Sequence, residues 1–130
     1  TGEIPWFDRR IHWRILQPDD PTDFPTAPDL ACFDRDHLPD ELLVRGPSPA
    51  EQIAALGMEG SKSVRDLLRD GDIPPSKRWR WPCLAIPGGS GPGHLLWVGG
   101  LRQSRHATVE EGTNRVVELS LSPHPLRTQT

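Results

Sequence analysis

The chain has 130 residues, of which 35% are hydrophobic and 25% charged, and its net charge is −3. That length suits one domain with its own core, and 15 Pro and 12 Gly argue against a helical bundle. The sequence contains no apolar run of the roughly 20 residues that a membrane helix needs, no signal-peptide pattern, and no zinc or disulfide spacing at Cys32 and Cys83. We therefore expect a cytoplasmic domain without a membrane partner or a metal site, with both cysteines as small buried residues.

The first half of the chain contains short strand patterns separated by turns. Residues 10–16 alternate apolar and polar side chains through Ile15, which predicts a strand. Residues 17–29 hold four prolines and four aspartates, as a linker would. Two further strands are predicted at residues 30–33 and 42–45. We divide the chain into an N-terminal strand with its linker (1–29), a main domain (30–121) and a tail (122–130).

The second half contains the clearest helix and a hairpin. Residues 61–70 predict a helix, because Ser63 and Asp66 have the spacing of a capping box and Gly71 can end it. Strands are predicted at residues 83–86 and 94–98, joined by a loop over 87–93, and at 115–121. The expected fold class is α+β, mostly β, made of short strands and hairpins with one amphipathic helix.

Cationic side chains concentrate in the middle of the chain. Residues 57–106 hold eight Lys and Arg against four acidic residues, a balance of +4, whereas residues 1–56 hold five against eleven, a balance of −6. A helical wheel that starts at Lys62 places Lys62, Arg65 and Arg69 on one face. The opposite face carries Val64, Leu67 and Leu68, which should be buried. The cationic face fits either an ordinary solvated surface or an anionic partner.

The segment after this helix adds cations between tryptophans. Lys77, Arg78 and Arg80 alternate with Trp79 and Trp81. Arginine binds phosphate through two parallel hydrogen bonds, and tryptophan can stack on a base. We expect Trp81 in the core, while Trp79 fits either environment. Arg78 is also a candidate buried partner for Asp70 or Asp72.

Several short motifs follow one another in a fixed order. They consist of Gly57, Gly60, Lys62, Val64, Arg65 and Asp66, then Ile73, Pro74, Arg78 and Pro82, then Trp97, Val98, Gly100, Leu101 and Arg102. In this order they resemble the C-terminal domain of bacterial tRNA(Ile)-lysidine synthases over about residues 30–121. The resemblance implies a fold similar to a domain of the phenylalanyl-tRNA synthetase β subunit. It also implies a domain that holds the tRNA body near the acceptor stem.

In the parent enzymes, ATP adenylates the wobble cytidine of an isoleucine tRNA, and lysine is then joined to it. That chemistry belongs to an N-terminal domain with a Ser-Gly-Gly-x-Asp-Ser loop, which this sequence lacks. We therefore expect no catalytic residues and no cofactor in this chain, with ATP bound by the catalytic domain. The expected partners are tRNA, that catalytic domain, and a second copy of the chain in a homodimer. The candidate tRNA-binding residues are Lys62, Arg65, Arg69, Lys77, Arg78, Arg80 and Arg102.

The turn after Arg45 departs from the family pattern. The family has a Gly-Asp-Arg-like turn there, whereas this chain has Gly46 and Pro47, with Glu51 following. The change removes a cation and adds an anion, which should weaken RNA binding.

Two alternative functions remain for the chain. One is a structural module that docks on protein. The other is an independent small enzyme, for which no nucleophile–base pair or metal-ligand set is found. Residues 60–63 lack the spacing of a phosphate-binding P-loop.

Overall fold

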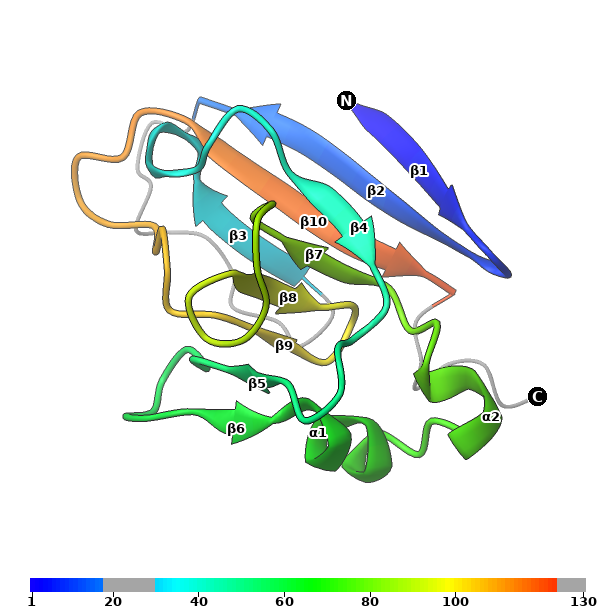
Figure 1. The fold of residues 1–130 in the computed structure, drawn as a ribbon. Helices are drawn as coiled ribbons and strands as arrows, with labels where there is room; N and C mark the ends of the chain where they lie inside the picture. The colour runs from blue at the N-terminus through cyan, green and yellow to red at the C-terminus, as the bar shows by residue number, and fades with distance from the viewer. Residues whose placement is uncertain (18–29, 124–130) are drawn as a thin grey trace.

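The computed structural model describes residues 1–17 and 30–123 and contains two four-stranded antiparallel sheets that lie face to face (Figure 1). The strands of the first sheet are, in spatial order, β1 (Gly2–Trp6), β2 (Arg9–Leu16), β10 (Val116–Ser122) and β3 (Leu30–Asp34). Those of the second are β4 (Leu43–Arg45), β7 (Cys83–Ala85), β8 (Leu95–Val98) and β9 (Arg102–Gln103). A short 3-10 helix, η2 (Arg35–His37), follows β3. The predicted α+β fold with mostly β content is confirmed.

The first sheet is built around β2, whose alternating pattern was visible in the sequence, and β10, which was also predicted as a strand. Ile11 pairs with Leu121 across the two strands, and both are buried. Strand β1 was not predicted, because it is short and contains Pro5. It is an edge strand, where a residue without a backbone N–H is tolerated. Residues 2–16 therefore share a sheet with β10 and contribute Ile11 to the core.

The second sheet covers the inner face of the first and is more deeply buried. All four residues of β8 are buried, and Trp97 packs in the same core cluster as Phe33 of β3. Strands β7 and β8 form the predicted hairpin. Trp81 is 3% exposed and donates its indole N–H to the Gly99 carbonyl at 2.9 Å, so its predicted core position is confirmed.

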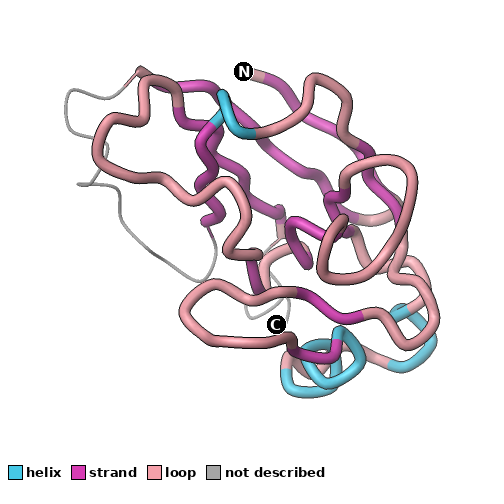
Figure 2. Tube along the Cα trace, turned by 60° about the vertical axis from the view of Figure 1, so that its left-hand side comes forward, coloured by secondary structure: helices cyan, strands magenta, loops and turns pink. Residues whose placement is uncertain are grey.

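Two α-helices lie together at one end of the molecule, away from η2 (Figure 2). Helix α1 covers Val64–Asp70 and helix α2 covers Pro75–Arg78. The prediction that α1 begins at residue 61 was wrong, because Lys62 and Ser63 form strand β6 (Lys62–Ser63), which pairs with β5 (Gln52–Ile53). Ser63 caps the helix, since its hydroxyl accepts the N–H of Asp66.

The apolar face of α1 packs as predicted. Val64, Leu67 and Leu68 are buried in the main core cluster. Cys83 is fully buried and Cys32 half-buried, and burial raises the pKa of the Cys83 thiol to about 12 and that of Cys32 to about 11. Neither thiol is therefore ionised near neutral pH. No helix in residues 1–17 and 30–123 is long and apolar enough to cross a membrane.

Candidate nucleic-acid interface

An open groove runs between the N-terminal turn of α1 and the turn over residues 47–52. Its volume is about 550 Å³, and Arg65, Arg78 and Trp79 all line it. Trp79 is 66% exposed, so it belongs to the surface and not to the core, the two environments that the sequence allowed for it. The groove thus brings two arginines and an indole ring, from separate helical segments, onto one surface.

Arg65 has the least compensated charge of the predicted cations on α1. It is exposed and forms no salt bridge among the described residues, whereas Arg69 lies 3.3 Å from Asp66 and 3.5 Å from Asp70. Lys62 also approaches Asp70, at 3.8 Å, and is half-buried. The single helical face that the sequence predicted for three cations is therefore wrong for Lys62, because this residue lies in a strand. Arg65 is the α1 cation best placed for an external anion.

Arg78 is held in place by the backbone rather than by a carboxylate. Its Nε donates to the Ile73 carbonyl at 2.9 Å, and the side chain is half-buried. Among the described residues it forms no salt bridge, so neither Asp70 nor Asp72 is the buried partner that the sequence suggested. One edge of the guanidinium is fixed while the rest of it remains available at the groove.

Like Lys62 and Arg69, the remaining three predicted cations do not line this groove. Lys77 approaches Asp8 at 3.8 Å, and the Arg80 guanidinium lies 4.9 Å from the centre of the Phe7 ring. Arg102 donates to the Leu56 carbonyl at 3.2 Å. Its Nε is buried without a hydrogen-bond partner among the described residues. The predicted set is therefore distributed over several places, with Arg65 and Arg78 sharing the groove.

The unusual turn after Arg45 is built around a buried ion pair. The side chain of Glu51 is fully buried and receives two hydrogen bonds from Arg45, at 2.8 and 2.6 Å. It also accepts the backbone N–H groups of Ser48 and Gly91, each at 2.8 Å. Burial alone would raise the pKa of Glu51, but these hydrogen bonds outweigh burial and hold the pKa below its usual value.

This geometry corrects the expectation that Glu51 adds a surface anion. Its charge is neutralised by Arg45 inside the turn, so it does not face the groove as a free carboxylate. The same pair removes Arg45 from the set of available cations. The sequence could not show this, because Glu51 is also tied to Gly91, which is distant in the chain.

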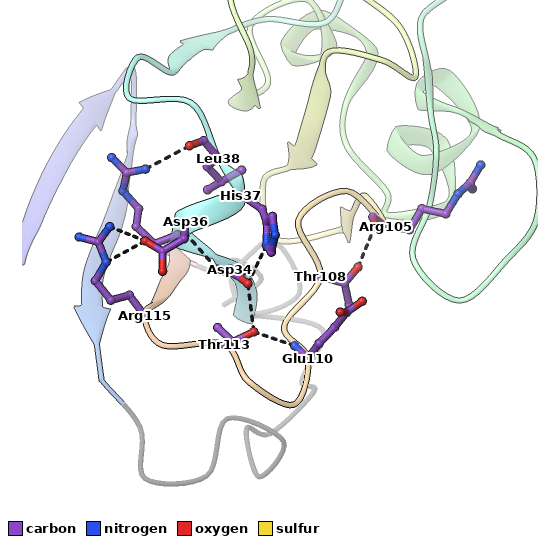
Figure 3. Close-up of polar contacts among 10 residues, drawn as sticks. Asp34, Asp36, His37, Leu38, Arg105, Thr108, Glu110, Thr113 and Arg115 are labelled. Carbon is purple, nitrogen blue, oxygen red and sulfur yellow. Dashed lines mark hydrogen bonds and ion pairs between the residues drawn. The ribbon is translucent and has the colours of Figure 1, made fainter.

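A second polar cluster, missed by the sequence analysis, surrounds Asp34 at the end of β3 (Figure 3). Asp34 is buried and lies 2.7 Å from His37 Nδ1, and it accepts hydrogen bonds from the Thr113 hydroxyl at 3.1 Å and the Asp36 N–H at 3.0 Å. Its own N–H donates to the Ala107 carbonyl. Burial would raise the pKa of Asp34, but the hydrogen bonds from His37, Asp36 and Thr113 lower it overall. The cluster fastens the loop before β10 to β3.

Metal coordination is not indicated in the part of the chain that the structure describes. There, no group of three His, Cys, Asp or Glu side chains is placed to hold a metal ion. The groove combines two guanidinium groups and an exposed indole ring with apolar and small residues such as Pro49 and Ala50. Guanidinium and indole groups suit an anionic, aromatic ligand.

The fold matches two kinds of solved domain. The crystal structure of a TilS C-terminal domain superposes with a TM-score of 0.76 and 22% identity, covering 92% of this chain and 88% of that one. An N-terminal fragment of the phenylalanyl-tRNA synthetase β subunit from Pyrococcus horikoshii gives a TM-score of 0.55 and 17% identity, covering 71% and 27%. The class is therefore a β-rich domain whose fold recurs in a tRNA synthetase subunit and in TilS.

Sequence comparison identifies the family within this class. The family model for the TilS substrate C-terminal domain matches residues 42–120. The tRNA(Ile)-lysidine synthase of Symbiobacterium thermophilum is 33% identical over 97 residues, covering 75% of the chain and 19% of that protein. That of Dehalococcoides mccartyi is 33% identical over 90 residues, covering 69% and 18%. The chain belongs to the TilS C-terminal domain family, as its motifs indicated, and spans about a fifth of the length of these relatives.

Proposed function

We propose that this chain is the tRNA-binding domain of a tRNA(Ile)-lysidine synthase and holds the tRNA near its acceptor stem. The supporting observation is the groove in which Arg65 and Arg78 lie without carboxylate partners among the described residues, beside the exposed ring of Trp79. Family membership gives this groove its most direct interpretation, since the relatives are named for an action on tRNA.

The chemistry of the groove suits a phosphate backbone. A guanidinium donates two parallel hydrogen bonds to a phosphate, and such contacts position RNA without reading its sequence. Because Glu51 is neutralised by Arg45, the turn that forms one wall adds no free carboxylate to repel phosphate. We expect the ATP-dependent steps to occur in the catalytic domain of the parent enzyme, with this domain as its partner.

The test is salt-dependent binding of tRNA to the chain. Neutralising a phosphate contact should weaken binding and lower the slope of log K against log salt by about one unit. We expect this for Arg65→Ala, and a weaker effect for Arg10→Ala, which removes the same charge from an exposed arginine on strand β2 that pairs with Glu3.

Equal effects of the two substitutions would show that only overall charge matters. Unchanged binding by Arg65→Ala and Arg78→Ala would reject the groove as the RNA surface. It would favour docking on the catalytic domain or on a second copy of the chain, which is separable by measuring the affinity of the variants for each protein.

A further inference from the structure

Two aromatic side chains from distant parts of the chain, Phe7 and Trp79, are exposed next to each other. Phe7 is 56% exposed and Trp79 is 66% exposed, and their ring centres are 5.6 Å apart in an edge-to-face arrangement. We call this pair the aromatic platform. Single exposed aromatic residues are ordinary on protein surfaces, whereas a contacting exposed pair forms a larger apolar patch, a feature that is common at interaction sites.

Contacts between the two segments hold the rings of the platform side by side. Phe7 lies in the turn between β1 and β2 with a positive φ of 55°, an unfavourable conformation for a bulky residue. The neighbouring Trp6 donates its indole N–H to the Arg80 carbonyl at 2.6 Å, and Asp8 approaches Lys77 at 3.8 Å. These contacts fasten the turn of the first hairpin to the segment that carries Trp79. The two rings are therefore brought together by contacts within the chain itself.

The charge around the platform favours an anionic ligand. The Arg80 guanidinium lies over the Phe7 ring at 4.9 Å, and Trp79 and Arg78 line the groove together. Lys77 is the third cation of this segment, and Asp8 offsets it. A purely apolar protein partner would have to desolvate these cations, whereas a nucleotide offers a flat ring for the indole and a phosphate for a guanidinium.

We infer that the aromatic platform stacks one unpaired base of the bound RNA, with Trp79 as the stacking surface and Arg78 or Arg80 next to the adjoining phosphate. Bases inside a duplex already stack on both sides, so an exposed ring selects a nucleotide from a single-stranded part of the RNA. This inference rests on the proposed function and adds to it a contact with a base, whereas the groove arginines contact phosphates.

The test separates the contribution of the bases to binding affinity from that of the phosphates. The unmodified chain and its variants are titrated with a short single-stranded oligoribonucleotide and with an abasic oligonucleotide of the same length, which keeps the phosphates and lacks the bases. Trp79→Ala should lower the affinity for the base-bearing strand by roughly 5- to 150-fold, the range that corresponds to loss of one stacked base. It should leave the abasic strand unaffected. Trp79→Phe should retain much of the affinity, because a ring remains.

Three further measurements serve as controls. Trp79 is mostly exposed, so Trp79→Ala should have the same thermal midpoint as the unmodified chain. Fluorescence quenching by the base-bearing strand should be reduced in Trp79→Phe, because the exposed indole is the one that contacts the base. Phe7→Leu, which removes the second ring, should weaken binding of the base-bearing strand less than Trp79→Ala does.

The possible results separate a failure of base stacking from a failure of the proposed tRNA binding. If Trp79→Ala weakens both strands equally, or neither, the platform does not stack a base, and the inference is overturned while salt-dependent tRNA binding stands. If the unmodified chain binds neither tRNA nor either strand, the proposed function itself fails. Normal RNA binding by Trp79→Ala together with lost affinity for the catalytic domain would assign the platform to a protein contact instead.

Discussion

Replacement of Glu51 by alanine should destabilise the domain strongly, although its position after a proline-containing surface turn makes it look dispensable in the sequence. The side chain is fully buried, and it accepts four hydrogen bonds. Removal leaves the Arg45 guanidinium without its carboxylate and the N–H groups of Ser48 and Gly91 without their acceptor. The turn would lose its attachment to the loop between β7 and β8.

The expected loss of unfolding free energy follows from the charged and polar groups that the substitution leaves unpaired. Breaking a buried ion pair by removing one partner costs about 3–5 kcal/mol. The Arg45 side chain is 21% exposed, so water can partly replace the lost carboxylate. We therefore expect a loss near the lower end of that range, about 3 kcal/mol. Replacing both partners, as in Arg45→Met with Glu51→Met, should cost less, because no charge is left buried and unpaired. The remaining cost comes from the Ser48 and Gly91 N–H groups, which still lose their acceptor.

The assay is urea unfolding followed by tryptophan fluorescence at several pH values. The folded state lowers the pKa of Glu51, so its contribution is present above the unfolded pKa and is lost as pH falls through the folded pKa. The stability difference between the unmodified chain and Glu51→Ala should therefore shrink in acid. A loss under about 1 kcal/mol at neutral pH, or a difference that does not change with pH, would refute the buried ion pair.

Three further predictions concern the core, the polar cluster around Asp34 and catalysis. Leu68→Ala should lower the free energy of unfolding, measured with urea, by about 2–5 kcal/mol. As a control, Arg65→Ala on the exposed face should change it by less than about 0.5 kcal/mol. Similar losses in the two variants would mean that the buried and exposed faces of α1 are misassigned. Asp34→Asn should speed amide hydrogen exchange of residues 105–115 without affecting β7 and β8, because it weakens the hydrogen bonds to His37 and Thr113. Unchanged exchange would show that the Asp34 cluster does not fasten this loop to β3. The chain alone should transfer neither adenylate nor lysine to tRNA in a radiolabel assay, since it lacks the Ser-Gly-Gly-x-Asp-Ser loop, and measurable transfer would overturn the assignment of chemistry to another domain.

The sequence alone determined the features that depend on near neighbours. Alternation predicted strand β2, although Ile15 on its apolar side is 42% exposed. Three- and four-residue spacing predicted the buried side of α1. Ser63 and Asp66 marked the start of that helix through a bond that spans three residues. The order of the motifs was enough to indicate the family, because it needs no knowledge of which segments touch.

Only the tertiary structure decided the features that depend on distant residues. Helix α1 begins after Lys62 because that residue pairs with Ile53 in a strand, which overrides its helical pattern. Glu51 is a buried structural carboxylate because Arg45 and Gly91 surround it. The groove shared by Arg65 and Arg78, and the contact of Phe7 with Trp79, likewise join separate segments. Local sequence shows which side chains are cationic or aromatic, but chain topology decides which of them meet and which are neutralised.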